Sequence, residues 1–178
     1  MKRSWLIWLT GLSDAGKSTL AEALVERLRA RSLQAFHLDG DHFRRILGAD
    51  LGFTATDRAE NLRRAGSVAR LLVEGGTAVV AAFVSPYQAD RNRIRDLFPP
   101  GTFAEVFVRC PLEVCEKRDT KGLYARVRRG EISDFTGISA PYEEPKFAEL
   151  VLDTELENVE GCVDRLEALA LQLELAVY

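Results

Sequence analysis

The sequence predicts an α/β fold in which a parallel sheet lies between two layers of helices. Three observations predict it: short apolar runs recur along the chain, stretches with apolar residues every three or four positions separate them, and a glycine-rich turn follows the first run. This alternation is typical of repeated βαβ units around a parallel sheet. With 178 residues and 47% hydrophobic composition, the chain can build one continuous core. We therefore expect a single domain over residues 1–178.

The expected elements alternate along the chain, and the first helix illustrates the spacing with Leu20, Leu24 and Leu28. Residues 118–142 differ, because they are rich in charge, glycine and aromatic side chains and show little core periodicity. We expect a mobile lid there. Strands are expected at Trp5–Leu9, Gln34–Leu38, Thr77–Val84, Phe103–Val108 and Glu149–Leu152, which makes the sheet roughly five-stranded. Helices are expected at Lys17–Arg31, Asp57–Glu74, Gln88–Leu97, Pro111–Lys117 and Val159–Leu173.

Composition excludes several classes of function. The net charge of −3 and the pI of about 5.5 provide no overall positive field for nucleic acid. Cys110, Cys115 and Cys162 are odd in number and lack Cys-x-x-Cys spacing, which argues against a disulfide framework or a zinc site. The apolar run from Trp5 ends at Gly11, too early for a signal peptide or a membrane span. We expect a cytoplasmic protein with reduced cysteines that binds neither nucleic acid nor membrane.

Residues 11–18 match the phosphate-loop pattern G-x-x-x-x-G-K-[ST] between an expected strand and an expected helix. Glycines let successive backbone N–H groups point at phosphate oxygens, and the helix N-terminus adds partial positive charge. Lys17 would reach the β- and γ-phosphates of ATP, and Ser18 would ligate Mg²⁺. The predicted ATP-binding residues in this loop are Gly11, Leu12, Ser13, Asp14, Ala15, Gly16, Lys17, Ser18 and Thr19.

Asp14 is unusual within a phosphate loop. A carboxylate about 4 Å from a phosphate would cost about 4 kcal/mol at an effective dielectric constant of about 20. We therefore predict that the Asp14 side chain faces solvent, with weakened nucleotide affinity as the other outcome.

A second acidic element, Leu38-Asp39-Gly40-Asp41, follows the second expected strand. Carboxylates at the carboxyl end of a parallel strand point into the crevice where such sheets bind ligands. We predict that Asp39 holds Mg²⁺ together with Ser18, and that Asp41 accepts the proton of an attacking hydroxyl. These two roles could be exchanged. The plainer interpretation is an Asp-Gly turn that caps a helix.

With these motifs, the sequence resembles the adenylyl-sulfate kinase family over nearly its whole length. The resemblance implies ATP- and Mg²⁺-dependent phosphorylation of the 3′-hydroxyl of adenosine 5′-phosphosulfate, on a three-layer P-loop kinase fold, as part of sulfate assimilation. It also implies pairing of subunits and functional coupling to a sulfate adenylyltransferase. The matching segments are Asp50–Phe53, Asp57–Arg64, Ala82–Pro86, Pro111–Cys115, Arg118–Tyr124, Gly130–Ile132, Phe135–Ile138 and Pro141–Glu143.

The resemblance also implies roles for single residues. Two guanidinium groups and an amide would hold the phosphosulfate and ribose of the acceptor, two phenylalanines would sandwich its adenine, and Arg118 would lie near ATP. Ser85, the serine often assigned as a phosphorylated intermediate, joins Lys17 and Asp41 among the catalytic candidates, although in-line transfer favours a hydrogen bond from Ser85 to substrate. The implied acceptor-binding residues are Asp39, Asp41, Arg44, Phe53, Arg58, Asn61, Val84, Ser85, Lys121, Leu123 and Phe135.

Three positions depart from the family's usual pattern: Asp14 replaces glycine, His42 replaces asparagine, and Thr120 replaces proline. Several candidates also have plainer interpretations. The phenylalanines could be core anchors, and Arg58, Asn61 and Arg64 could form a solvated helix face, which is the interpretation we prefer for Arg64.

Three alternative functions stay open. The first is a kinase for another nucleotide or a sugar acid, and the second is a non-catalytic domain that binds a phosphosulfate nucleotide. The third is an ATPase switch, which lacks a residue to position attacking water. The absence of an Asp-Glu pair after an apolar run, and of an Asn-Lys-x-Asp motif, favours a kinase.

Overall fold

All of the expected strands form in the computed structural model, which describes residues 4–175. They build one sheet in the order β2-β3-β1-β4-β5, and every neighbouring pair is parallel. The predicted α/β fold class is therefore confirmed. The strands are β1 (Leu6–Thr10), β2 (Ala35–Asp39), β3 (Ala78–Ala82), β4 (Phe103–Arg109) and β5 (Leu150–Asp153).

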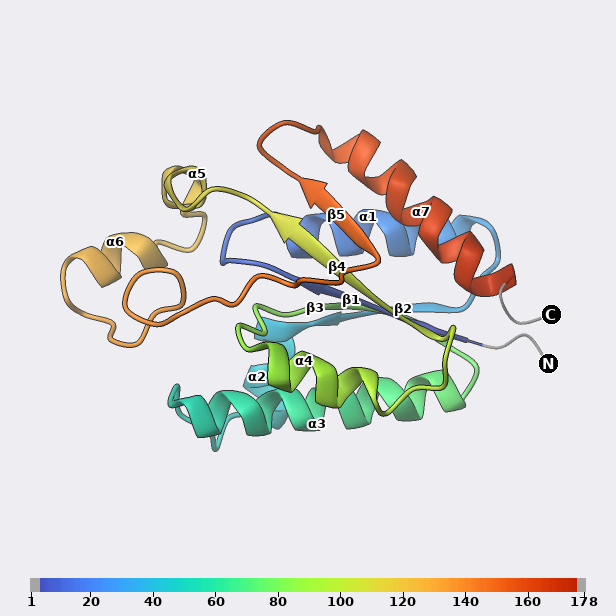
Figure 1. Cartoon of the computed structure of the whole chain (residues 1–178), viewed down its shortest axis with the longest axis horizontal. Coiled ribbons are helices and arrows are strands. Elements are labelled where there is room, and N and C mark those ends of the chain that lie inside the picture. The colour runs from blue at the N-terminus through green and yellow to red at the C-terminus, as the bar shows by residue number, and fades with distance from the viewer. Residues whose placement is uncertain (1–3, 176–178) are drawn as a thin grey trace.

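Helices cover both faces of the sheet, which makes three layers (Figure 1). On one face lie α1 (Lys17–Ala30) and α7 (Val159–Leu175), which pack against each other. On the other face lie α2 (Gly40–Leu47), α3 (Ala55–Glu74) and α4 (Gln88–Arg95). Two short helices, α5 (Leu112–Arg118) and α6 (Leu123–Arg128), lie to one side of the sheet, at its carboxyl-terminal edge.

Alternation along the central strand explains why the sheet has a core on each face. Ile7 and Leu9 on β1 join the cluster under α1 and α7, whereas Leu6 and Trp8 join the cluster under α3 and α4. Because successive side chains of a strand point to opposite faces, a strand that is covered on both sides must be apolar throughout. Every residue of β1 and β3 is buried, and all are apolar except Thr10 at the end of β1, whose hydroxyl is hydrogen-bonded.

Two helices were not predicted, and both begin at a polar cap. α2 follows Asp39, whose carboxylate accepts hydrogen bonds from the backbone N–H groups of Asp41 and His42. α6 lies within the expected lid and follows Gly122, which has φ of 65°. Asp119 accepts hydrogen bonds from the first backbone N–H groups of α6. In each case the helix starts near an Asp and a Gly, and because these residues favour turns, the sequence pattern indicates a turn there.

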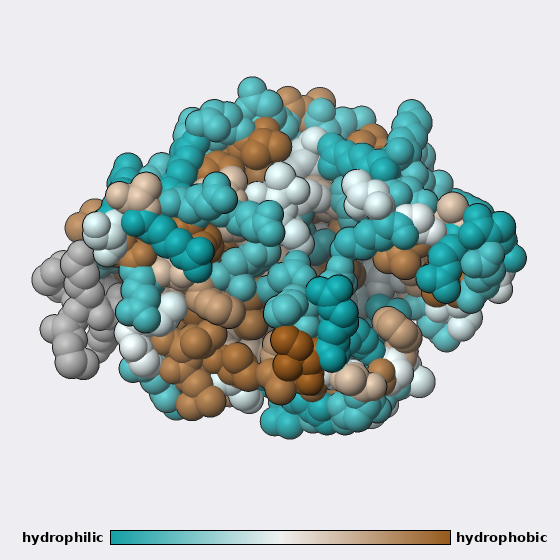
Figure 2. All heavy atoms as spheres, turned by 180° about the vertical axis from the view of Figure 1, so that it is seen from behind, coloured by the Kyte–Doolittle hydropathy of each residue, from teal (hydrophilic) through white to brown (hydrophobic). Residues whose placement is uncertain are grey.

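The surface of the molecule mixes polar and apolar side chains. Seen from behind, hydrophilic residues surround apolar ones, which gather in the lower part of the view (Figure 2). Exposed large apolar residues on α2 and α3 include Ile46 and Leu71. Cys110, Cys115 and Cys162 are buried and free, as predicted. Within residues 4–175, none of the helices is both long and apolar enough to cross a bilayer.

Packing of α1 against the sheet should contribute to the free energy of unfolding. Leu24 on α1 is 0% exposed, whereas Leu71 on α3 is 68% exposed. We predict that Leu24→Ala lowers the free energy of unfolding by about 2–5 kcal/mol, because it removes buried methyl groups and leaves a cavity. The matched variant Leu71→Ala should change it by less than about 0.5 kcal/mol. Urea denaturation measures both, and equal effects would contradict this description of the core.

Candidate functional site

A cavity of about 470 Å³ lies at the carboxyl ends of the central strands, where the phosphate loop, α2, α3 and the lid meet. It brings together most of the predicted site residues, which come from segments far apart in the sequence. Predicted residues that line it are Ser13, Asp14, Gly16, Lys17, Ser18, Thr19, Asp39, Asp41, Arg44, Phe53, Arg58, Asn61, Val84, Ser85, Arg118 and Lys121. Predicted residues outside its lining are Gly11, Leu12, Ala15, Leu123 and Phe135.

The phosphate loop has the backbone that its glycines predict. A Cβ at Gly11 would lie 2.4 Å from the carbonyl oxygen of Val108, so only glycine allows the loop to pass this close to β4. Gly16 has φ of 101° and is the N-cap of α1, and no side chain caps that helix. The first backbone N–H groups of α1 therefore remain available to an anion, and the helix dipole favours one there.

Lys17 is the first residue of α1, and its ammonium is buried. Its Nζ donates a hydrogen bond to the carbonyl oxygen of Leu12 at 2.5 Å. Burial, assisted by the positive charge of Lys121, lowers the pKa of Lys17 to about 8. A negative phosphate beside this ammonium would oppose both effects and stabilise its charged form.

Ser18 and Asp39 lie side by side across the loop and the end of β2. Ser18 Oγ donates to Asp39 Oδ2 at 2.8 Å, while Asp39 Oδ1 accepts the two backbone N–H groups that cap α2. Burial opposes ionisation of Asp39, but the hydrogen bonds from the His42 N–H group and Ser18 outweigh it and lower the pKa. Asp39 is thus a carboxylate that caps a helix and also faces the phosphate loop.

Asp41, in the first turn of α2, projects into the open part of the cavity. Its side chain is 63% exposed and forms an ion pair with Lys121 from the lid. Unlike Asp39, it caps no helix. The lid and the acidic element therefore meet at a carboxylate that a ligand in the cavity could reach.

Two guanidinium groups gather around one aromatic ring on the α2–α3 side of the cavity. The guanidinium carbon of Arg44 lies 4.3 Å from the centroid of the Phe53 ring, and that of Arg58 lies 5.9 Å from it. Arg58 also donates to the Thr136 hydroxyl at 3.0 Å and to the Asp134 carbonyl oxygen in the lid. Burial lowers the pKa of both arginines. This side of the cavity is suited to an anion next to a flat apolar group.

Asn61 lies on the floor of the same side. It is buried, and its Oδ1 has no hydrogen-bond partner among residues 4–175. A Cβ at Gly48 would lie 2.4 Å from that oxygen, so glycine is needed where the amide packs. Arg64, by contrast, forms ion pairs with Asp50 and Glu60 and is not among the residues that line the cavity. Our preferred interpretation of Arg64 as a surface residue is consistent with these contacts.

Only one of the two phenylalanines that are expected to sandwich the adenine lines the cavity. Phe53 lines it, but Phe135 packs against the core cluster and contacts the edge of Tyr124 with ring centroids 5.0 Å apart. Leu123 starts α6 and is also outside the cavity. The plainer interpretation of Phe135 as a core anchor fits this arrangement, because a half-buried aromatic side chain gains more from packing than from facing water.

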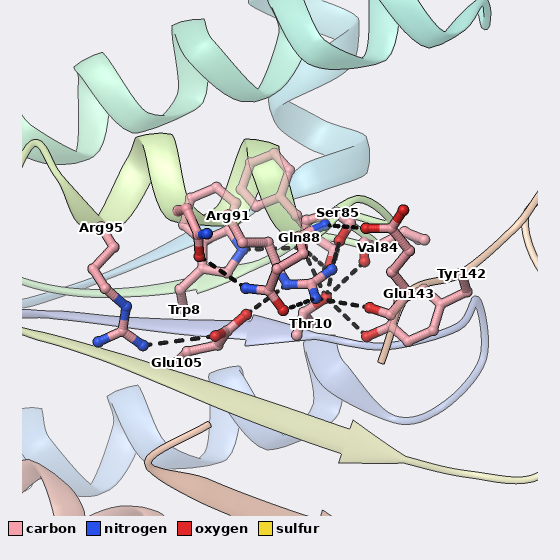
Figure 3. Close-up of polar contacts among 12 residues, drawn as sticks. Trp8, Thr10, Val84, Ser85, Gln88, Arg91, Arg95, Glu105, Tyr142 and Glu143 are labelled. Atoms are coloured by element: carbon pink, nitrogen blue, oxygen red, sulfur yellow. Dashed lines mark hydrogen bonds and ion pairs between the residues drawn. The ribbon is translucent and has the colours of Figure 1, made fainter. Parts of the chain in front are cut away.

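Ser85, predicted as a catalytic candidate that hydrogen-bonds the substrate, has its hydroxyl bonded to other protein groups in this structure. Ser85 is 2% exposed, and its Oγ accepts a hydrogen bond from Trp8 Nε1 at 3.1 Å. The same Oγ donates to Thr10 Oγ1 at 2.8 Å, so the hydroxyl proton is occupied within the protein (Figure 3). Ser85 lines the cavity, but its hydroxyl forms hydrogen bonds that link the segment after β3 to β1.

Asp14 is also bound more tightly than we predicted. It is half-buried rather than freely solvated, and its Oδ1 accepts the Thr120 backbone N–H at 3.2 Å together with the Thr120 hydroxyl. Arg118 donates to the Asp14 carbonyl oxygen at 3.3 Å. The carboxylate therefore turns toward the lid. This orientation explains how a phosphate loop can carry an acidic residue.

One group of cavity residues had no motif in the sequence. Thr154 directly follows β5, and its Oγ1 donates to the carbonyl oxygen of Ala15 at 2.8 Å and accepts from Arg118 at 3.2 Å. The signal that could have found it is its place, because ligands bind where parallel strands end. Its unpredicted neighbours in the lining are Glu157, Val159 and Cys162.

The contact between Asp14 and Thr120 predicts a measurable local effect. Asp14→Ala removes the acceptor of the Thr120 backbone N–H, so we expect hydrogen exchange at that N–H to become about tenfold faster. Glu131→Ala is the control, because Glu131 pairs with Arg126 and Arg129 in the same lid. Hydrogen exchange followed by mass spectrometry measures both variants. Unchanged exchange at Thr120 in Asp14→Ala would contradict the contact.

Comparison with known proteins agrees with this geometry. The model of the family described as adenylylsulphate kinase matches residues 3–153. An adenylyl-sulfate kinase of Bacillus velezensis is 52% identical over 164 residues, which are 92% of this chain and 83% of the relative. The structure of the Mycobacterium tuberculosis APS kinase CysC in complex with AMPPNP and APS superposes with a TM-score of 0.91 at 42% identity, covering 95% of this chain and 98% of the other.

A hexameric APS kinase from Thiobacillus denitrificans superposes with a TM-score of 0.70 at 30% identity, covering 99% of this chain but 30% of that longer chain. The family model spans most of the chain, the relatives match nearly its full length, and the cavity contains the phosphate loop and the acidic element. The chain therefore belongs to the adenylyl-sulfate kinase family.

Proposed function

We propose that the cavity binds ATP on the phosphate loop and adenosine 5′-phosphosulfate against the α2–α3 side, and that the chain transfers the γ-phosphate to the 3′-hydroxyl of the acceptor. The observation that carries this proposal is the single cavity, which joins the buried ammonium of Lys17 to the two guanidinium groups of Arg44 and Arg58. A donor and an acceptor that are both anionic need positive charge at both ends, and this cavity has it.

On the ATP side, backbone N–H groups of the phosphate loop and the N-terminus of α1 bind the phosphates. Lys17 places its charge beside the β- and γ-phosphates and stabilises negative charge that develops during transfer. Arg118 and Thr154 mark the direction in which the nucleoside extends, because they form the cavity wall beyond the loop. ATP is the phosphate donor of the family's reaction.

Mg²⁺ fits the residues at the front of the loop. The Ser18 hydroxyl and the Asp39 carboxylate are hard oxygen donors in contact with each other. Within residues 4–175 no cluster of three or more His, Cys, Asp or Glu side chains could hold a metal ion. This suits Mg²⁺, which proteins usually bind with one or two carboxylates and substrate phosphates. When bound there, it would neutralise charge on the triphosphate.

On the acceptor side, Arg44 and Arg58 hold the phosphosulfate, Phe53 packs against the adenine, and Asn61 reaches the ribose. Asp41 is the general base. The 3′-oxygen attacks the γ-phosphorus, the bond from phosphorus to the bridging oxygen of ADP breaks, and the proton of the hydroxyl passes to Asp41 late in transfer. Asp41 suits this role better than Asp39, whose two oxygens are occupied by α2 and Ser18.

The lid contacts both halves of the cavity. Tyr124 donates to the carbonyl oxygen of Ser13 in the phosphate loop at 3.0 Å, and Lys121 pairs with Asp41. Closure of residues 118–142 over bound substrates would exclude water and prevent hydrolysis of ATP.

A cytoplasmic location, pairing of subunits and functional coupling to a sulfate adenylyltransferase complete the proposal, and they rest on the family resemblance alone.

The decisive experiment is turnover with ATP and adenosine 5′-phosphosulfate, with the products separated and identified. We expect ADP and a nucleotide that carries a new 3′-phosphate. Lys17→Ala should lower kcat by about 10²–10³-fold, because it removes a charge that stabilises the transition state. A panel of other nucleotides and sugar acids tests the alternative acceptors. Faster phosphorylation of any of them would overturn the assignment.

The proposed base makes a separate prediction. Asp41→Asn should lower kcat by about 10²–10⁴-fold, because the amide cannot accept the hydroxyl proton. Binding of a non-hydrolysable ATP analogue should change by less than about twofold, since Asp41 lies outside the phosphate loop. Asp50→Asn is the matched control, because Asp50 is similarly exposed at 61% and pairs with Arg64 outside the cavity. Intact turnover of Asp41→Asn would exclude it as the base.

A further inference from the structure

A guanidinium is buried beneath the wall of the cavity that holds Ser85. Arg91, on α4, is 1% exposed and pairs with Glu105 on β4, where the distance from Nε to Oε1 is 2.6 Å. The side chain of Glu105 is 4% exposed, so the two charges are almost completely removed from water. Neither residue lines the cavity.

The remaining donors of Arg91 reach two segments that are far apart in the sequence (Figure 3). Nη1 donates to the carbonyl oxygen of Ser85 at 2.7 Å, and Nη2 donates to the carbonyl oxygen of Glu143 at 2.7 Å. Nη2 also donates to Gln88 Oε1 at 2.9 Å. A planar guanidinium can make these bonds together because its donors point in fixed, divergent directions.

The first segment is the wall of the cavity at Val84–Pro86, and it has a constrained backbone. Ser85 has φ of 39°, which a residue with a side chain rarely adopts and which persists only when its surroundings enforce it. Thr10 Oγ1 donates to the carbonyl oxygen of Val84 at 2.8 Å, and the Ser85 hydroxyl is occupied by Trp8 and Thr10. Arg91 Nη1 makes the shorter contact to the Ser85 carbonyl oxygen, at 2.7 Å, while Thr10 Oγ1 lies 3.3 Å from it.

The second segment is the chain where it leaves the lid. Besides the bond from Arg91, the backbone N–H of Glu143 donates to the Pro86 carbonyl oxygen at 2.8 Å. Glu143 Oε2 in turn accepts the backbone N–H of Gln88 at 2.7 Å. The Tyr142 hydroxyl lies 3.0 Å from Thr10 Oγ1. The end of the lid is therefore joined to the Val84–Pro86 wall of the cavity. The side chain of Arg91 binds the backbone of both segments.

We propose that Arg91 is a positioning residue for the acceptor: it holds the Ser85 backbone and the base of the lid in the geometry that the acceptor requires. The inference rests on the proposed function, because it takes the Val84–Pro86 wall to be part of the acceptor site. Glu105 acts by fixing the guanidinium plane. Loss of the divergent hydrogen bonds should weaken acceptor binding and leave the phosphate loop, on the other side of the cavity, intact.

The alternative is that the pair serves only the core. A buried ion pair adds little net stability over apolar residues of similar size, whereas removing one partner leaves an unpaired buried charge and is strongly destabilising. Removing both charges together therefore separates the two explanations. A core role predicts that such a variant has the KM values of the wild type for both substrates.

The test compares two variants that leave no unpaired charge. Arg91→Met with Glu105→Met removes the pair, and Arg91→Lys keeps the charge but loses the divergent donors. For each, we expect the KM for adenosine 5′-phosphosulfate to rise about tenfold, while the KM for ATP changes by less than about twofold. Arg93→Met is the control, because Arg93 lies on the same helix and pairs with Asp90 but bonds none of Glu105, Ser85 and Glu143.

Each outcome decides the inference. A rise in the acceptor KM alone supports positioning, and titration calorimetry with the acceptor should show the same loss of affinity. An unchanged acceptor KM in a folded variant, or an equal rise in both KM values, overturns it. If the double variant does not fold, Arg91→Lys alone decides. Failure of the wild type to phosphorylate adenosine 5′-phosphosulfate would instead overturn the proposed function.

Discussion

The buried ammonium of Lys17 is the constraint on which the site depends. Burial makes its charge costly, and the carbonyl oxygen of Leu12 is a weak partner for a full positive charge. The uncapped N-terminus of α1 adds further positive potential at the same point. A polyanion at this position would stabilise the charged form of Lys17 and interact favourably with the helix N-terminus, so the arrangement favours binding of a triphosphate.

Around that point, the lid connects to the body of the protein at several separate places. Tyr124 and Thr120 bind the phosphate loop, Lys121 binds Asp41 in the first turn of α2, and Thr136 binds Arg58 on α3. The chain then returns along the acceptor wall, where Arg91 holds Glu143. Each contact involves a segment that carries a proposed substrate contact. Movement of the lid is therefore coupled to the donor side, the acceptor side and the proposed base through direct bonds, and no distant relay is needed.

Sequence patterns predicted the layers of the fold well, because alternation of buried strands with amphipathic helices is a local signal. They did not locate α2 and α6. The Asp39-Gly40 pair indicates a turn that caps a helix but not the extent of that helix, and Asp119 with Gly122 looks like a turn alone. For the site, motif residues came together as expected. The roles of Ser85 and Phe135 stay predictions, because sequence does not reveal which way a side chain points, and in this structure both contact other protein groups.

The contact between the phosphate loop and the lid links two of the positions at which this chain departs from its family. Thr120 binds Asp14 through two donors, its backbone N–H and its hydroxyl, and proline lacks both. An aspartate at position 14 with a proline at position 120 would leave the carboxylate without either donor, beside bound phosphates. The residue tolerated at position 120 therefore depends on the residue at position 14, because proline at 120 would remove both donors from an aspartate at 14.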